Sequence, residues 1–186
     1  FELRREASLE TLTTDVVTSS SIEGENLNPR EVRSSIARRL GIDIGGYVPA
    51  GRNVEGTVEM MLDATRSFDS PLTTERLFDW HAALFPTGRT YDEIDVEIGR
   101  FLDWFEAPND TDPVLRAGIA HFSFVTLHPF EDGNGRIARA ITDMALARAD
   151  GMRDRFYSMS AQIEMEREHY YARLERQQRG STDLTE

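Results

Sequence analysis

Apolar residues recur along almost the whole chain at steps of three and four, which is the spacing of one helix face. No segment shows a convincing alternation with a period of two, and residues 155–158 are at most a short extended piece. The pattern therefore predicts an all-α chain in one compact unit, with a core shared by seven or eight helices. Its apolar stripes place these helices near residues 2–18, 28–41, 53–68, 72–86, 94–105, 112–128, 135–151 and 160–179.

Helix boundaries are marked by capping residues. Asn28 and Asp112 each precede a proline, and this order is typical of an N-cap followed by the first helical position. Gly41 and Gly151 follow the last apolar position of their stripes, where a glycine with positive φ commonly ends a helix. These four residues fix the ends of three of the predicted helices.

Composition excludes several classes of function. Acidic residues outnumber basic ones 33 to 21, giving a net charge of −12, which argues against a nucleic-acid partner. The absence of cysteine excludes disulfides, thiol chemistry and cysteine-ligated zinc. No apolar run approaches the roughly 20 residues needed to cross a bilayer, so no membrane partner is expected. A cytoplasmic location fits the absence of cysteine. Because Phe1 is not an initiator methionine and no signal pattern follows, the chain is expected to be a fragment of a longer product.

Two predicted helices are joined by the stretch H-P-F-E-D-G-N-G-R at residues 128–136. Gly133 and Gly135 permit positive φ and close approach to a ligand, and the helix that begins there offers N–H groups without intrahelical partners. Such a start makes a nest for an anion, with phosphate as the natural guest. Arg136 and Arg139 lie in the first turn and can add bidentate bonds to phosphate oxygens.

Three further side chains of this stretch carry chemistry. Asp132 supplies a hard oxygen that, beside phosphates, is more useful as a Mg²⁺ ligand than as a counter-anion. His128 stands at the end of the preceding helix, placed to take a proton from an incoming hydroxyl. Asn134 can cap the helix or donate its amide to a phosphate oxygen. Each residue alone is more often structural, and it is their combination in nine consecutive residues that favours a phosphate-handling site.

The stretch resembles the signature H-P-F-x-D/E-G-N-G-R of the Fic family, and every fixed position matches. The resemblance extends from roughly Ser19 to Tyr171. It implies a helical enzyme that transfers AMP from ATP, with Mg²⁺, to a Ser, Thr or Tyr hydroxyl of a target protein. It also implies that His128 is the general base, that Asp132 holds Mg²⁺, and that Phe130 is a buried anchor for the loop.

The same resemblance assigns the phosphate contacts. Asn134, with the N–H groups of Gly133 and Gly135, would cradle the α- and β-phosphates, and Arg136 and Arg139 would bind the outer ones. The intact glycine and arginine positions favour AMP transfer over transfer of a phosphate group.

A second motif lies upstream, where residues 19–24 match the inhibitory pattern S/T-x-x-x-E-G/N of the family. The resemblance implies that Glu23, on a helix that begins its motif at Ser19, pairs with Arg139. An arginine paired in this way cannot also hold the γ-phosphate, so the enzyme would be autoinhibited. The chain then divides into a helical region at residues 1–51 that carries this motif and a Fic core at residues 52–186.

The adenine site and the flap are the least defined parts of the resemblance. Tyr171 aligns with a tyrosine that packs near the base in relatives, and Gln178 stands where some relatives have an amide side chain; one of Tyr170 and Tyr171 is expected to pack in the core. Relatives also carry a β-hairpin flap after the helix that ends near Pro86. Residues 87–92 are too few for such a hairpin, so the flap is either missing or left out of this chain.

Two other functions fit the same residues. One is a hydrolase that removes AMP from a modified protein and uses the inhibitory glutamate to position water. The other is a catalytically silent nucleotide-binding module. The intact His128 and Asp132 argue against it, because a silent protein has no need for a base beside a Mg²⁺ ligand. The sequence leaves the target protein, the direction of the reaction and the formation of a homodimer open.

Overall fold

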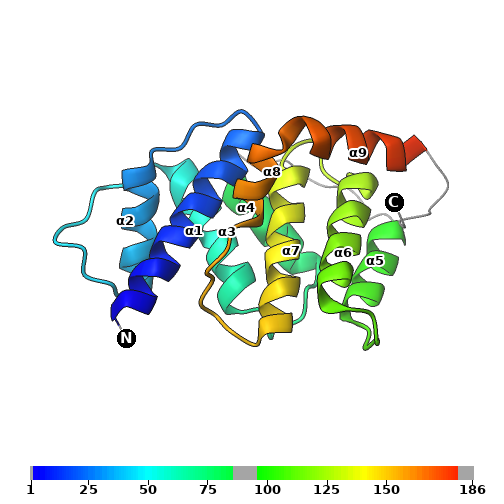
Figure 1. The fold of residues 1–186 in the computed structure, drawn as a ribbon, viewed down its shortest axis with the longest axis horizontal. Coiled ribbons are helices and arrows are strands. Elements are labelled where there is room, and N and C mark those ends of the chain that lie inside the picture. Colours follow the sequence, from blue (N-terminus) through cyan, green and yellow to red (C-terminus); the bar gives the residue numbers. More distant parts are fainter. Residues whose placement is uncertain (1, 86–95, 180–186) are drawn as a thin grey trace.

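The structure is a computed structural model that describes residues 2–85 and 96–179. These residues form nine helices and no strand, which confirms the all-α prediction (Figure 1). The position of the expected flap, residues 87–92, lies outside the described residues. The helices are α1 (Glu2–Ile22), α2 (Pro29–Leu40), α3 (Arg52–Arg66), α4 (Thr74–Leu84), α5 (Val96–Glu106), α6 (Pro113–Leu127), α7 (Asn134–Asp150), α8 (Met159–Met165) and α9 (Arg167–Arg179).

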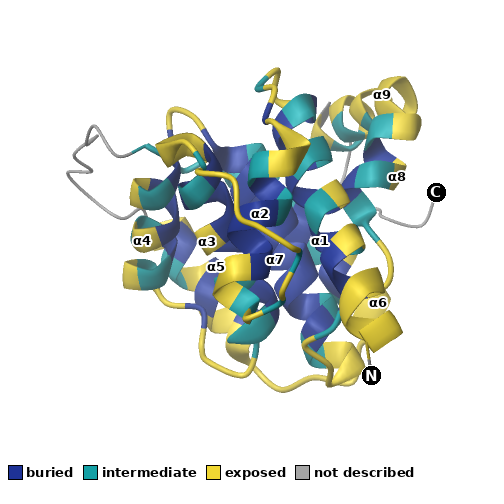
Figure 2. Cartoon of the chain, turned by 90° about the vertical axis from the view of Figure 1, so that its left-hand side faces the viewer, coloured by how far each residue is buried: buried dark blue, intermediate teal, exposed yellow. Residues whose placement is uncertain are grey.

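Helix α7 is the centre of the fold and packs against α1, α3, α4, α6 and α8. Figure 2 shows buried residues gathered around it near the middle of the molecule. Ile137, Ile141 and Met144 are fully buried on this helix, and so are the polar Arg139 and Asp143. Because α7 is enclosed on most sides, its charged residues need partners from the surrounding helices.

The expected helix ends at the capping residues are confirmed. Asn28 Oδ1 accepts a bond from Arg30 N at 3.0 Å, and Asp112 Oδ1 accepts from the first backbone N–H groups of α6 at 3.0 Å. Gly41 and Gly151 have φ of 63° and 61°, the left-handed conformation that glycine adopts with little strain.

Two boundaries differ from the prediction. Helix α1 continues four residues past 18, because the polar residues at its end stay helical until Gly24, with φ of 82°, turns the chain. The single helix predicted over residues 160–179 is wrong: it is two helices separated at Glu166, whose φ of −112° interrupts the first. Helix α8 packs against α1, whereas α9 passes the end of α6 and bonds it through Gln178 and Thr126 (Figure 1).

None of the helices in the described part of the chain combines the length and apolar character that crossing a bilayer requires.

A buried ionic cluster connects α1 with α7 and the segment before α8. Arg155 Nη2 donates to Asp143 Oδ1 at 2.7 Å, and both side chains are almost completely buried. Asp15 on α1 accepts bonds from Ser158 Oγ and, at 3.3 Å, from Ser160 N. Burial first, and then the neighbouring carboxylate of Asp15, raise the pKa of Asp143 well above its usual value. Asp15 and Asp143 thus lie close together while Arg155 bonds Asp143, and a proton retained on Asp143 relieves the repulsion between the two carboxylates.

This cluster predicts a pH-dependent stability. Because the pKa of Asp143 is higher in the folded than in the unfolded chain, its contribution is present below the ordinary aspartate pKa and is lost as pH rises through the folded value. Asp143→Asn keeps an oxygen for Arg155 but cannot ionise. The free energy of unfolding of this variant should therefore improve relative to the parent as pH rises, measured by urea titration at several pH values. Asp103→Asn, at an exposed position on α5, is the control; equal pH profiles for parent and Asp143→Asn would contradict the shared proton.

Candidate active site

The loop after α6 begins with an unusual backbone conformation. Helix α6 ends at Leu127, and His128 has φ of 49° and ψ of 53° while its N–H still bonds Phe124 O at 3.1 Å. Among the residues that the structure describes, His128 is the one residue other than glycine with positive φ. This conformation costs energy for a residue with a Cβ and is concentrated at functional sites. It leaves the imidazole at the surface, accessible to a second molecule.

The middle of the loop is held by Phe130 and Asn134. Phe130 is 4% exposed, and its ring lies 4.5 Å from that of His81 and 6.3 Å from that of Phe124. Asn134 Oδ1 accepts from Phe130 N at 3.0 Å, and its Nδ2 donates to Phe130 O at 2.6 Å. The N-cap position belongs to Gly133, so Asn134 is not the helix cap. Its two bonds to Phe130 brace the loop, and its expected contact with a phosphate stays a prediction.

The two glycines of the loop are needed for close contacts. A Cβ on Gly133, whose φ is 85°, would lie 2.8 Å from the ring of Phe85. A Cβ on Gly135 would lie 2.0 Å from Glu23 Oε1. The carboxylate of Glu23 therefore rests directly on the first turn of α7, over the backbone that the sequence analysis expects to receive phosphate.

Arg139 is the most completely bonded residue of this site. Its Nε donates to Ser19 Oγ at 2.8 Å, and its Nη2 donates to Ser19 O and to Glu23 Oε1, both at 2.8 Å. The side chain of Arg139 is 1% exposed, whereas that of Glu23 is 30% exposed. The structure thus brings together the three residues that the upstream motif and the loop motif assign to one contact.

Arg136 has a partner that the sequence analysis missed. Its Nη1 donates to Glu25, and its guanidinium carbon lies 5.2 Å over the ring centre of Phe85. Its side chain is 7% exposed, and its Nε is buried without a hydrogen-bond partner in the described structure. The signal that could have found Glu25 is the glycine at position 24, because a glycine at a helix end commonly turns the next residue back toward that end.

Asp132 is exposed at the edge of the loop, and its Oδ1 accepts from Gly133 N at 2.7 Å. The described residues contain no group of three histidine, aspartate or glutamate side chains that could enclose a metal. A single exposed carboxylate does fit Mg²⁺, since that ion is commonly held by one or two carboxylates together with substrate phosphates and water. Asp132 is therefore the residue suited to hold it.

The side chains of Tyr170 and Tyr171 lie in different surroundings. Tyr170 Oη lies 2.7 Å from His121 Nε2, and His121 Nδ1 lies 3.1 Å from Thr142 Oγ1. Burial lowers the pKa of His121 to about 4 and raises that of Tyr170 to about 12, so both are neutral at physiological pH. Because Thr142 Oγ1 donates to Ala138 O, the histidine donates to Thr142 and accepts from Tyr170.

Tyr171 is 43% exposed and lies beside Arg167, whose guanidinium carbon is 6.0 Å from the ring centre. Gln178 Nε2 bonds Thr126 Oγ1 at 3.4 Å. Tyr170 is thus the member of the pair with packing and hydrogen-bond partners in the helical core, and Tyr171 keeps a face available for a ligand. Its expected contact with an adenine base stays a prediction.

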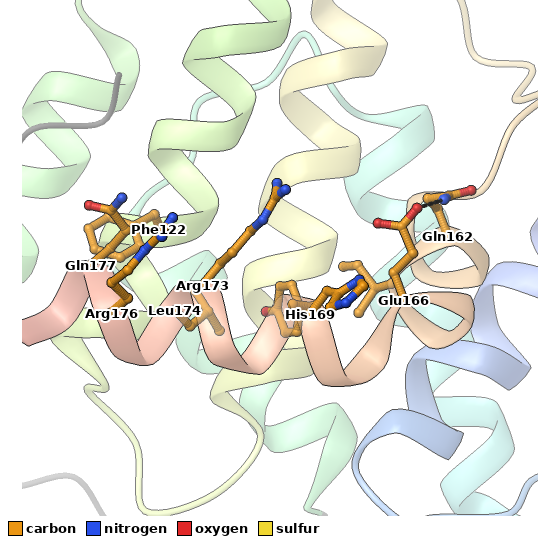
Figure 3. A pocket seen from close by; sticks show the side chains of 10 residues that line it. Phe122, Gln162, Glu166, His169, Arg173, Leu174, Arg176 and Gln177 are labelled. Carbon is orange, nitrogen blue, oxygen red and sulfur yellow. Dashed lines mark hydrogen bonds between the residues drawn. The ribbon is translucent and has the colours of Figure 1, made fainter. Parts of the chain in front are cut away.

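A cavity of about 280 Å³ lies apart from the loop, between α6, α8 and α9 (Figure 3). Apolar residues such as Phe122 and Ile163 line it together with polar ones such as His169 and Arg173, and none of its lining residues belongs to residues 128–139. The candidate site is therefore assigned to the loop and the start of α7, where the charged groups converge, and not to this cavity.

The position of Glu23 predicts the effect of Gly135→Ala. The added methyl group would displace the Glu23 carboxylate, so the variant should lose about 1–3 kcal/mol of unfolding free energy. In a Glu23→Gly background the same change should be neutral or stabilising, because alanine favours a helix over glycine. Urea unfolding of the four proteins of this cycle gives the coupling between the two positions. An equal effect of Gly135→Ala in both backgrounds would mean that Glu23 does not lie on this turn.

Comparison with known proteins agrees with these features. Residues 71–146 match the Fic/DOC family, and residues 1–42 match a domain of unknown function, DUF4172. Protein adenylyltransferase fic-1 of Caenorhabditis elegans is 38% identical over 80 residues, which cover 42% of this chain and 15% of the relative. Protein adenylyltransferase Fic of Drosophila grimshawi is 25% identical over 169 residues, covering 78% of this chain and 35% of the relative.

Solved structures show the same fold. Fic-1 from C. elegans matches with a TM-score of 0.62 at 23% identity, and a Fic family protein from Desulfovibrio desulfuricans with 0.64 at 20% identity. Each comparison covers 94% of this chain and 58% of the other chain. The chain therefore spans little more than half of these solved relatives and a smaller share of the curated ones.

Proposed function

The chain belongs to the Fic/DOC family, and from this premise we propose that it is a protein adenylyltransferase, transferring AMP from ATP to a Ser, Thr or Tyr hydroxyl of a target protein. The observation that carries the proposal is the loop at residues 128–136: an exposed histidine in a strained conformation stands beside a glycine-lined helix start with two arginines. A base, a cradle for phosphates and cations for the outer phosphates are the parts that such a transfer needs.

In the proposed reaction the hydroxyl oxygen of the target attacks the α-phosphorus of ATP. A new P–O bond forms, the bond between the α-phosphorus and the bridging oxygen breaks, and pyrophosphate leaves. His128 takes the hydroxyl proton, for which its exposed position is suited. The N–H groups of Gly133 and Gly135 stabilise charge on the α- and β-phosphates, and Arg136 and Arg139 bind the outer ones.

Asp132 would hold Mg²⁺, which when bound offsets negative charge on the phosphates. Asn134 acts through the loop: its two bonds to Phe130 fix the backbone that presents the N–H groups. The protein mainly positions the reactants and does little covalent work.

The same proposal includes autoinhibition. Arg139 is bonded to Ser19 on α1 and to Glu23 just after it, and the Glu23 carboxylate lies over Gly135. A phosphate cannot use this arginine or approach this turn until the carboxylate leaves. The target protein, a cytoplasmic location and a homodimer are expectations of the proposal, and a de-AMPylating hydrolase is its alternative because Glu23 stands at the loop where it could position water.

We predict opposite effects of two substitutions on AMP transfer. Glu23→Gly should raise ATP-dependent labelling of proteins in a lysate, since it frees Arg139 and uncovers Gly135. His128→Ala should reduce transfer by about 10²-fold or more, because it removes the base. Mass spectrometry for an AMP adduct is the measurement.

His169→Ala is the matched control, an exposed histidine away from the loop. Equal labelling by Glu23→Gly with and without His128 would contradict the mechanism. Release of AMP from a modified protein that requires Glu23 would instead identify the hydrolase.

A further inference from the structure

We propose that Glu25 is a second inhibitory carboxylate, which occupies Arg136 while Glu23 occupies Arg139. The inference rests on the proposed function, because it takes the two arginines to be the groups that bind the outer phosphates of the nucleotide. Glu23 and Glu25 then act together as a carboxylate pair, which carries two negative charges and bonds both arginines. A terminal phosphate carries a charge of the same order, so the carboxylate pair resembles the phosphate whose binding it blocks.

The pair is positioned by the end of α1. Glu25 N donates to Ser20 O at 3.0 Å, and Gly24 N donates to Ser21 O at 2.9 Å. These two bonds, with Gly24 at φ of 82°, are the Schellman arrangement that closes a helix. The left-handed glycine between the two glutamates turns the chain so that both carboxylates reach the start of α7. One helix cap therefore positions both members of the carboxylate pair.

Glu25 is also held from a second direction. Its Oε1 accepts from Asn53 Nδ2 at 3.4 Å, a contact with the first turn of α3. Arg136 lies between this carboxylate and the ring of Phe85. The contact is therefore built from the segments that follow α1 and α4 as well as from α3 and α7, which distinguishes it from a chance surface ion pair whose two partners are both mobile in solvent.

Arg136 is not saturated by Glu25. One of its terminal nitrogens bonds the carboxylate, while Nε stays buried without a hydrogen-bond partner in the described structure. A guanidinium can offer Nε and a terminal nitrogen together to two oxygens of one phosphate. A phosphate, which offers more oxygens than Glu25 does, could accept from the unused Nε of Arg136. A phosphate should therefore bind Arg136 more strongly than the Glu25 carboxylate does.

This arrangement predicts that removing Glu23 releases only part of the inhibition. Glu23→Gly frees Arg139, but Arg136 stays paired with Glu25. We expect Glu25→Gln in the Glu23→Gly background to tighten ATP binding by about tenfold more, the size of one charge-assisted contact to phosphate. ADP should gain less and AMP should gain nothing, because AMP has no outer phosphate.

The experiment measures equilibrium affinity by calorimetry for ATP, ADP and AMP with Mg²⁺, with every variant in a His128→Ala background so that no turnover occurs. The variants are Glu23→Gly, Glu25→Gln, the double variant, and Glu10→Gln as a control for loss of one exposed charge from α1. Thermal unfolding of each protein checks folding. Because Glu25→Gln leaves a buried cation without its counter-charge, ATP should raise the melting temperature of this variant more than that of Glu10→Gln.

The outcomes separate this inference from the proposed function. If Glu23→Gly binds ATP tightly and the double variant binds no better, Glu25 has no inhibitory role and the proposed function stands. If all three nucleotides gain equally, the gain does not come from outer phosphates and the inference is wrong. If no variant binds ATP, the proposed function fails and the inference fails with it. Glu25→Ala, which removes the acceptor altogether, repeats the test with a second substitution.

Discussion

The structure depends on one buried cation, the guanidinium of Arg139, which must be paired inside the protein. Arg139 is 1% exposed, and a buried cation without partners would destabilise the fold by several kcal/mol, on the order of 3–5. Its partners come from Ser19 and Glu23, more than a hundred residues away in sequence. The folded state therefore requires the end of α1 to stay on the start of α7. Stability and, in the proposed function, inhibition are two consequences of the same contact.

The contact also explains how a carboxylate and a nucleotide could compete for the same site. Each offers oxygens and negative charge to the same buried cations, and each removes them from an unfavourable environment. The side chain of Glu23 is 30% exposed and that of Glu25 is 33% exposed, so the carboxylates are better solvated than the arginines they serve. Releasing the carboxylates to water is correspondingly cheaper than leaving the arginines unpaired, which favours exchange of one anion for another over an empty site.

Local signals made much of the fold predictable, whereas contacts between distant segments were beyond the sequence. The caps at Asn28 and Gly151 follow from residue chemistry at the helix ends, and the loop motif identified its glycines and arginines directly. The break at Glu166 was not predictable because α8 and α9 pack against different helices, and no glycine or proline marks the change of direction. The bonds of Asn134 and the partner of Arg136 depend on how the loop and α1 meet, which periodicity does not encode.

The position of Glu23 follows from a register that is fixed elsewhere along α1. Asp15 lies beside Asp143, Ser19 bonds Arg139, and Glu23 lies on Gly135, so contacts recur every four residues in opposite directions along the two helices. Residues four apart share one helix face, so these contacts lie on one seam between antiparallel helices. Polar groups buried at such a seam disfavour a shift of one helix along the other, because a shift would leave charges unpaired. The aspartates and Arg155, remote from the loop, therefore help to hold the carboxylate of Glu23 at Arg139, and loosening that end of the seam would weaken this contact.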